Sequence, residues 1–239
     1  MITTRVSTIA RAAVCAGFIG AAAVGSAAAA NATPTAPHLA GQPGGLYGDP
    51  AAAAPYWRYQ RLDDCALMAS ADVVGQLTGH EPSEQAIVDV AENTPSQNHP
   101  GSIYLPPANR NDPNSGNGTD PADIPVLLAH YGIDSVYTDQ DDVRKTGIAT
   151  GLPALEHDLA GGHKVIAGVN AELIWNQPGD QTHADHALVV TGVDTVAGVV
   201  HLNDSGIKSG RDEQVPIATF VKAWNTSGES MIVTEQTGN

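Results

Sequence analysis

The amino-acid sequence predicts an α+β fold, on two observations. Amphipathic helical patterns fill much of residues 65–159, and short apolar runs typical of strands follow over residues 164–234. Helices that precede the strands, rather than alternating with them, are typical of α+β domains. We therefore expect N-terminal helices packed on a C-terminal antiparallel β-sheet.

Four helices are expected ahead of the strands, each with apolar residues on one face and a capping residue or glycine at an end. The first begins at Cys65, where Asp63 or Asp64 can cap it and Gly79 can end it. In the third, Pro125 favours a start at Asp123 or a kink. These helices are expected over residues 65–77, 83–92, 120–131 and 152–159.

Strand patterns follow the fourth helix, where the apolar periodicity changes. Each pattern is a short run of apolar and β-branched residues. The strands are expected over residues 164–169, 187–193, 199–202 and 230–234, with a further helix near 215–224 before the last of them.

Residues 1–30 have the features of a signal peptide. Arg5 and Arg11 precede an apolar stretch over residues 12–28, and small residues at Ala28 and Ala30 fit a cleavage site. A membrane anchor is the alternative, but the stretch is short and a polar, proline-containing segment follows it. We expect export to an extracytoplasmic location, with no stable membrane span after cleavage.

Residues 31–56 are rich in Pro, Gly and Ala, which predicts a flexible linker before a folded domain over residues 57–235. The linker contains Gly44 and Gly45, and one hypothesis is that the domain cuts this linker after Gly45, in a neighbouring molecule rather than in its own chain. The composition is strongly acidic, with 26 Asp and Glu against 11 Lys and Arg. Such a charge balance argues against nucleic-acid binding. Nothing in the sequence indicates an oligomeric state.

Cys65 is the one cysteine that remains after signal removal, because Cys15 lies in the apolar stretch. A free thiol is a liability outside the cytoplasm unless it is used. The first turn of a helix favours the thiolate, which is the reactive form of cysteine. Cys65 is therefore the candidate nucleophile.

Three further residues complete a candidate catalytic set. His186, at the start of an apolar strand, is placed to act as the base, and Asp204, at the end of the next strand, can orient the imidazole. The side-chain amide of Gln60 and the backbone N–H of Cys65 can stabilise an oxyanion. This chemistry requires no metal and no cofactor.

Two alternatives for these residues stay open. Asn203 competes with Asp204, since neighbouring strand residues point to opposite faces and either side chain can hold an imidazole. A metal site is the second alternative, because imidazoles and carboxylates gather near one strand. Its candidate ligands are His183, Asp185, His186 and Asp204.

The string from Gln60 to Asp64-Cys65, then Asp185-His186 leading a strand that ends in Thr191-Gly192, then Asn203-Asp204, resembles a known family. The resemblance is to stand-alone relatives of the bacteriocin-processing, double-glycine-type cysteine peptidases, cysteine peptidase family thirty-nine of the papain-like superfamily. It implies a papain-like fold, and Gln60, Cys65, His186 and Asp204 match the family's catalytic positions.

The function expected is a secreted papain-like cysteine peptidase or amidase, with a peptide or protein as substrate. It would act through a covalent acyl-cysteine. Two alternatives remain: a catalytically silent peptide- or envelope-binding module on the same fold, and an acyl transferase that uses an amine as acceptor.

Overall fold

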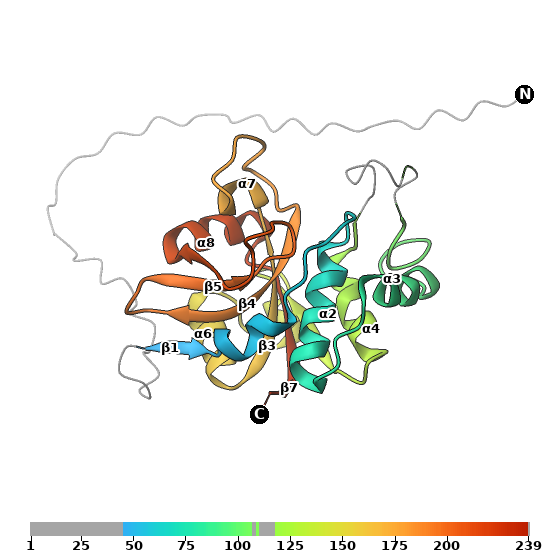
Figure 1. Cartoon of the computed structure of the whole chain (residues 1–239), viewed down its shortest axis with the longest axis horizontal. Helices are drawn as coiled ribbons and strands as arrows, with labels where there is room; N and C mark the ends of the chain where they lie inside the picture. The colour runs from blue at the N-terminus through green and yellow to red at the C-terminus, as the bar shows by residue number, and fades with distance from the viewer. Residues whose placement is uncertain (1–44, 107–108, 110–117, 239) are drawn as a thin grey trace, which may run out of the picture. The chain divides into compact units, whose positions relative to one another are not determined.

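A seven-stranded antiparallel sheet organises the protein, whose computed structural model describes residues 45–106, 109 and 118–238 (Figure 1). The strands lie in the order β2-β7-β3-β4-β5-β6, and β1 pairs with β4 beside them. Their bounds are Leu46–Gly48 (β1), Ser135–Thr138 (β2), His163–Val169 (β3), His186–Asp194 (β4), Val199–Asn203 (β5), Glu213–Pro216 (β6) and Met231–Thr237 (β7).

Eight α-helices and three short 3-10 helices accompany the sheet in the described residues. The α-helices are Pro50–Ala53 (α1), Cys65–Thr78 (α2), Glu84–Asn93 (α3), Ile124–Ala129 (α4), Val143–Thr146 (α5), Leu152–Ala160 (α6), Ala171–Ile174 (α7) and Ile217–Trp224 (α8). The 3-10 helices are Ala54–Tyr56 (η1), Pro121–Asp123 (η3) and Asn225–Ser227 (η4).

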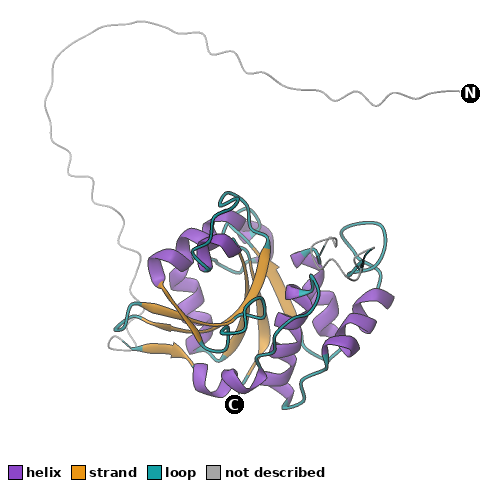
Figure 2. Ribbon diagram, turned by 45° about the horizontal axis from the view of Figure 1, so that its top comes forward, coloured by secondary structure: helices purple, strands orange, loops and turns teal. Residues whose placement is uncertain are grey.

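Helices cover both faces of the sheet (Figure 2). On one face, α2 and α4 pack on side chains such as Ile166 and Val189. On the other face, α6 and α8 pack on side chains such as Val165 and Leu188. Because neighbouring strand residues point to opposite faces, β3 and β4 carry apolar residues at nearly every position. The strand that begins with His186 is thereby fixed from both sides.

Helix α2 is the most deeply buried helix near the site. Its residues from Ala66 to Gly75 are buried between the sheet on one side and α3 and α4 on the other. Gly79 ends the helix in the left-handed conformation, at φ 75°, as the sequence predicts. A helix held along its whole length gives the residue at its first position, Cys65, a fixed place.

The predicted fold class and the main elements are confirmed. The expected helices correspond to α2, α3, α4 with η3, and α6, and the expected strands correspond to β3, β4, β5 and β7. Ser83 caps α3 through a hydrogen bond from the N–H of Ala86, and Pro125 lies in the first turn of α4. The third helix begins with the 3-10 turn η3 rather than as one continuous α-helix.

The linker prediction is wrong for residues 46–56. Strand β1 pairs with Gly192–Asp194 of β4, and α1 and η1 follow it directly. The alanines of this segment are helical, because Asp49 caps α1 and Pro50 stands at its first position. Ala53 is buried. Residues 1–44, which hold the predicted signal peptide, lie outside the described residues.

The hypothesis of cleavage after Gly45 loses the flexibility on which it depends. The carbonyl of Gly45 accepts hydrogen bonds from the N–H and hydroxyl of Thr195, and Leu46 already belongs to β1. The peptide bond between Gly45 and Leu46 is therefore held at the edge of the sheet. Gly44 lies outside the described residues.

The other elements that sequence patterns missed are short. They are β2, β6, α5 and α7, none longer than four residues. Tertiary pairing stabilises elements of this length, and their local sequence carries little periodicity. Within the described residues, no helix is both long enough and apolar enough to cross a membrane.

Candidate active site

Cys65 stands at the first position of α2, and its side chain is partly exposed. It is the one cysteine among the residues described, and it is a free thiol. Its side chain lies at the same cleft as His186 from β4, close enough for the charge of Cys65 to act on the imidazole. The structure thus joins the two residues that the sequence predicts as nucleophile and base, although 121 positions of sequence numbering separate them.

His186 is buried and paired with Asp204. Its Nε2 lies 2.7 Å from Oδ1 of Asp204, and the two residues are 8% and 0% exposed. Because Nε2 is engaged by the carboxylate, the other ring nitrogen is the one that can exchange a proton with Cys65. Cysteine-dependent catalysis requires a thiol, a base beside it and a group that orients the base, and Cys65, His186 and Asp204 lie in this order.

His186 and Asp204 each shift the pKa of the other. Burial alone would lower the pKa of His186, but the negative charges of Asp204 and Cys65 and hydrogen bonds to both raise it well above its usual value. Burial alone would raise the pKa of Asp204, but the imidazolium and several hydrogen bonds lower it. Both shifts favour the charged forms, an imidazolium facing a carboxylate.

Asp204 receives two further hydrogen bonds that sequence reasoning missed. The backbone N–H of Gly206 donates to Oδ1 at 2.7 Å, and the indole N–H of Trp175 donates to Oδ2 at 2.8 Å. The Trp175 ring also packs on the His186 ring, with centroids 5.2 Å apart. Trp175 therefore orients the Asp204 carboxylate and covers the His186 ring.

A second tryptophan holds the backbone of the same residue. The indole N–H of Trp57 donates to the carbonyl of Asp204 at 2.5 Å. The available sequence signal was only that the chain has three tryptophans, and no fixed spacing connects Trp57 or Trp175 to Asp204.

The structure separates Asn203 from the histidine. The Asn203 amide donates to the carboxylate of Asp72 on α2 at 2.8 Å and to the carbonyl of Ala53 at 3.0 Å. It therefore points to the opposite face from Asp204, as alternation along a strand requires. Of the two candidates, Asp204 is the one in contact with His186.

Gln60 lies beside the Asp204 segment. Its backbone N–H donates to the carbonyl of Ser205, and its Oε1 accepts a hydrogen bond from the Ser205 hydroxyl at 2.7 Å. The amide nitrogen donates to the carbonyl of Leu62 at 2.9 Å. Since an amide has two N–H groups, one donor is left over. The role of Gln60 toward an oxyanion stays a prediction.

A cleft of about 350 Å³ opens beside Cys65 and His186. Its apolar walls come from α2, β3 and β7, and include Ile166 and Ile232. Gly168 keeps it open, because a Cβ there would lie 2.5 Å from the hydroxyl of Ser230. The cleft can take small or apolar side chains next to the thiol.

The residues of the alternative metal site do not gather. His183 contacts Asp180 and Thr182 in an exposed turn. Asp185 accepts a hydrogen bond from the N–H of Ala171 at the start of α7. Across the part of the chain that the structure describes, no group of three or more His, Cys, Asp or Glu side chains is arranged to hold a metal ion.

The antiparallel sheet, the helix that begins with cysteine and the buried His–Asp pair define a papain-like protein. The model of the Peptidase_C39 like family matches residues 54–232, and the chain belongs to this family.

The relatives found by sequence are uncharacterized proteins. One from Mycobacterium tuberculosis and one from Mycobacterium bovis are each 55% identical over 240 residues, which is 98% of this chain and 100% of the relative. Among solved structures, a proposed C39-like peptidase from Bacillus anthracis aligns with a TM-score of 0.54 and 17% identity, over 78% of this chain and 97% of that one. That likeness supports the fold.

Proposed function

We propose that this protein is an exported cysteine peptidase or amidase that cleaves a peptide or amide bond through a covalent acyl-cysteine. The observation that carries the proposal is the buried pair of His186 and Asp204, which shares a cleft with Cys65 at the start of a helix. Membership of a C39-like peptidase family supports the class of reaction. Export is supported by the sequence of residues 1–30.

The residues divide the reaction between them. The thiolate of Cys65 attacks the carbonyl carbon, and its negative charge passes to the carbonyl oxygen, which the Cys65 N–H and the Gln60 amide can stabilise. His186 gives its proton to the leaving amine as the C–N bond breaks, which leaves a thioester. His186 then takes a proton from water, and the hydroxide attacks the thioester. The C–S bond breaks, the carboxylic acid leaves, and the Cys65 thiolate and the His186 imidazolium are restored.

Alkylation of Cys65 tests the proposal without a known substrate. We expect iodoacetamide to modify Cys65 faster in the native protein than in the unfolded protein at pH 6, because the His186 imidazolium stabilises the thiolate. His186→Ala should remove this advantage. His201→Ala is the matched control, since His201 forms a similar pair with Asp212 at 2.7 Å but does not contact Cys65.

An acyl-enzyme test completes the experiment. Incubation with p-nitrophenyl acetate should add one acetyl group to Cys65, detected by intact mass, and the group should then be lost by hydrolysis. A native thiol that reacts only after unfolding would contradict the proposal and favour a silent binding module. An acyl group released only when an amine is added would favour acyl transfer.

A further inference from the structure

The positive charges of this acidic protein are concentrated beside the candidate active site. Four of the eight Lys and Arg residues that the structure describes lie on two short segments, 57–61 and 206–211. The eight are Arg58, Arg61, Arg144, Lys145, Lys164, Lys208, Arg211 and Lys222.

The two segments lie side by side. The backbone of Gln60 bonds to the carbonyl of Ser205 at 3.0 Å, and cations of the second segment lie over aromatic rings of the first. Lys208 Nζ is 5.9 Å from the Tyr59 ring centroid, and the guanidinium carbon of Arg211 is 5.3 Å from that of Trp57. We call Trp57, Arg58, Tyr59, Arg61, Lys208 and Arg211 the basic aromatic surface.

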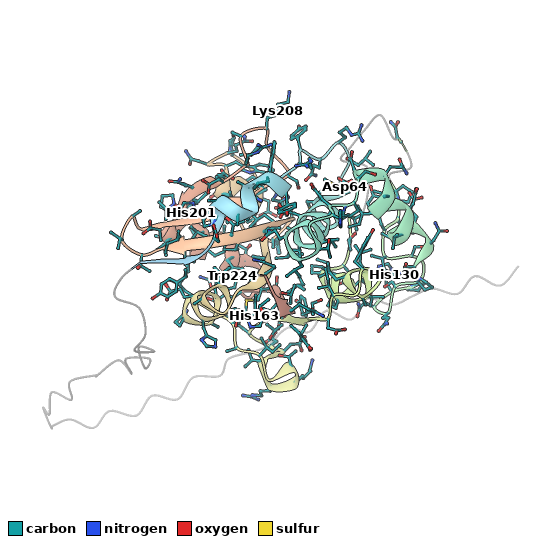
Figure 3. The ribbon with its side chains drawn as sticks, turned by 60° about the horizontal axis from the view of Figure 1, so that its bottom comes forward. Asp64, His130, His163, His201, Lys208 and Trp224 are labelled. Carbon is teal, nitrogen blue, oxygen red and sulfur yellow. The ribbon has the colours of Figure 1, made fainter. Side chains whose placement is uncertain are left out.

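Two of its cations are already neutralised and two are not. Arg58 pairs with Glu81 at 2.8 Å, and Arg61 pairs with Glu84. Lys208 and Arg211 are exposed, and neither has a carboxylate partner among the described residues. Figure 3 shows Lys208 projecting outward at the edge of the molecule. The rings hold these cations in place without reducing their charge.

The surface adjoins the reacting groups. Lys208 and Arg211 follow Asp204 within seven positions, and the intervening Gly206 lies against His186, where a Cβ would be 3.0 Å from the imidazole Cε1. The cleft beside Cys65 is lined by other parts of the chain, and no residue of the basic aromatic surface contributes to its wall. The cleft and the basic aromatic surface are therefore distinct, and Gly206, on the loop that carries Lys208 and Arg211, lies against His186.

We propose that the basic aromatic surface binds an acidic side chain of the peptide substrate next to the bond that is cleaved. Lys208 and Arg211 would hold the carboxylate, and Tyr59 and Trp57 would contact the peptide beside it. The remainder of the protein is rich in carboxylates, but screening over about 8 Å at physiological salt leaves the nearest charges dominant. This inference rests on the proposed function, because it assumes that a peptide occupies the site.

A binding measurement in Cys65→Ala protein tests the proposal apart from catalysis. The probes are fluorescein-labelled Ala-Ala-Glu-Glu-Ala-Ala and Ala-Ala-Gln-Gln-Ala-Ala, followed by fluorescence anisotropy. We expect the Glu peptide to bind about three- to tenfold more tightly than the Gln peptide, the effect of two partly exposed ion pairs. The difference should shrink as NaCl rises from about 0.05 M to about 0.5 M.

Two double variants with the same change in charge locate the effect. Lys208→Gln with Arg211→Gln should abolish the preference for the Glu peptide, and Arg144→Gln with Lys222→Gln should preserve it. Equal binding of the two peptides, binding of neither, or equal loss in both double variants would overturn the proposal. Thermal unfolding of each variant confirms that the fold is kept.

The result is separable from that of the proposed function. A Glu preference in a protein whose Cys65 never forms an acyl intermediate would leave the surface assigned and the enzyme rejected. An active enzyme without a Glu preference would do the reverse.

Discussion

Two buried aspartates flank the candidate active site, and their surroundings differ in every respect but burial. Asp204 is 0% exposed and accepts hydrogen bonds from His186, Gly206 and Trp175. Asp64, labelled in Figure 3, is 1% exposed and directly precedes Cys65, yet both of its carboxylate oxygens lack a donor in the described structure.

The pKa values follow the donors rather than the burial. The pKa of Asp204 is lowered, because the imidazolium and two further donors, Gly206 and Trp175, outweigh the loss of water. The pKa of Asp64 is raised to about 7, first by burial and then by the negative charge of Glu84. Asp64 is therefore protonated about half of the time at pH 7, which reduces the negative charge next to Cys65.

The largest expected effect comes from removing the charge of Asp204. Asp204→Asn keeps the size of the side chain but cannot stabilise the His186 imidazolium, so turnover should fall on the order of 10³- to 10⁴-fold. The assay is the Cys65-dependent hydrolysis of p-nitrophenyl acetate, with thermal unfolding as the check that the fold is kept.

Asn203→Ala is the matched control for that change. The neighbouring side chain binds Asp72 and Ala53 on the other face of the sheet, so its loss should lower stability and change turnover only a few-fold. A collapse of turnover in Asn203→Ala, with normal turnover in Asp204→Asn, would reverse the assignment of the orienting residue.

A smaller effect is expected from Gly210→Ala, because the backbone of Gly210 holds the backbone of Asp204 in place. The carbonyl of Gly210 accepts the N–H of Asp204 at 2.8 Å, and a Cβ at this position would lie 1.9 Å from the Asp204 carbonyl oxygen. Gly210→Ala must therefore move the loop, at a cost of about 1–3 kcal/mol in the free energy of unfolding.

Urea unfolding and turnover together test this second prediction. The urea midpoint and the turnover should both fall in Gly210→Ala. Gly198→Ala should lower the urea midpoint alone, because Gly198 has positive φ in a β-turn but has open space around it. An unchanged unfolding midpoint in Gly210→Ala would show that the loop accepts the added carbon without moving.

The difference between local patterns and long-range contacts explains which parts of the site could be predicted from the sequence. The helix that begins at Cys65 and the apolar strand that begins at His186 are local patterns, and the structure has both. The contact of His186 with Asp204 rather than Asn203 joins residues from two such strands, and alternation allowed either. The resemblance of the quoted strings to a known family favoured Asp204, and Asp204 is the residue in contact with His186.

The supports of Asp204 could not be reached in this way. Trp57 is 147 positions distant and Trp175 is 29 positions distant, and neither lies at a spacing that a helix or strand imposes. The paired residues 46–56 were missed for a similar reason, because β1 is three residues long and depends on β4 for its hydrogen bonds. Long-range donors of this kind leave no periodic trace in the chain.

The last expected effect, and the sharpest test of the comparison, is the pH dependence of Asp64→Asn. A folded pKa raised from 3.8 to about 7 means that the native state binds the proton more tightly than the unfolded chain does. The resulting stability is fully present below about pH 4 and is lost as the pH rises to 7. Asn does not titrate, so the variant should match wild type at pH 4 and exceed it by about 4 kcal/mol at pH 8. Asp204→Asn should show the opposite dependence, because a lowered pKa stabilises the fold above the unfolded value and that stability is lost in acid. Urea unfolding at several pH values measures both, and a difference for Asp64→Asn that stays constant with pH would contradict a protonated Asp64.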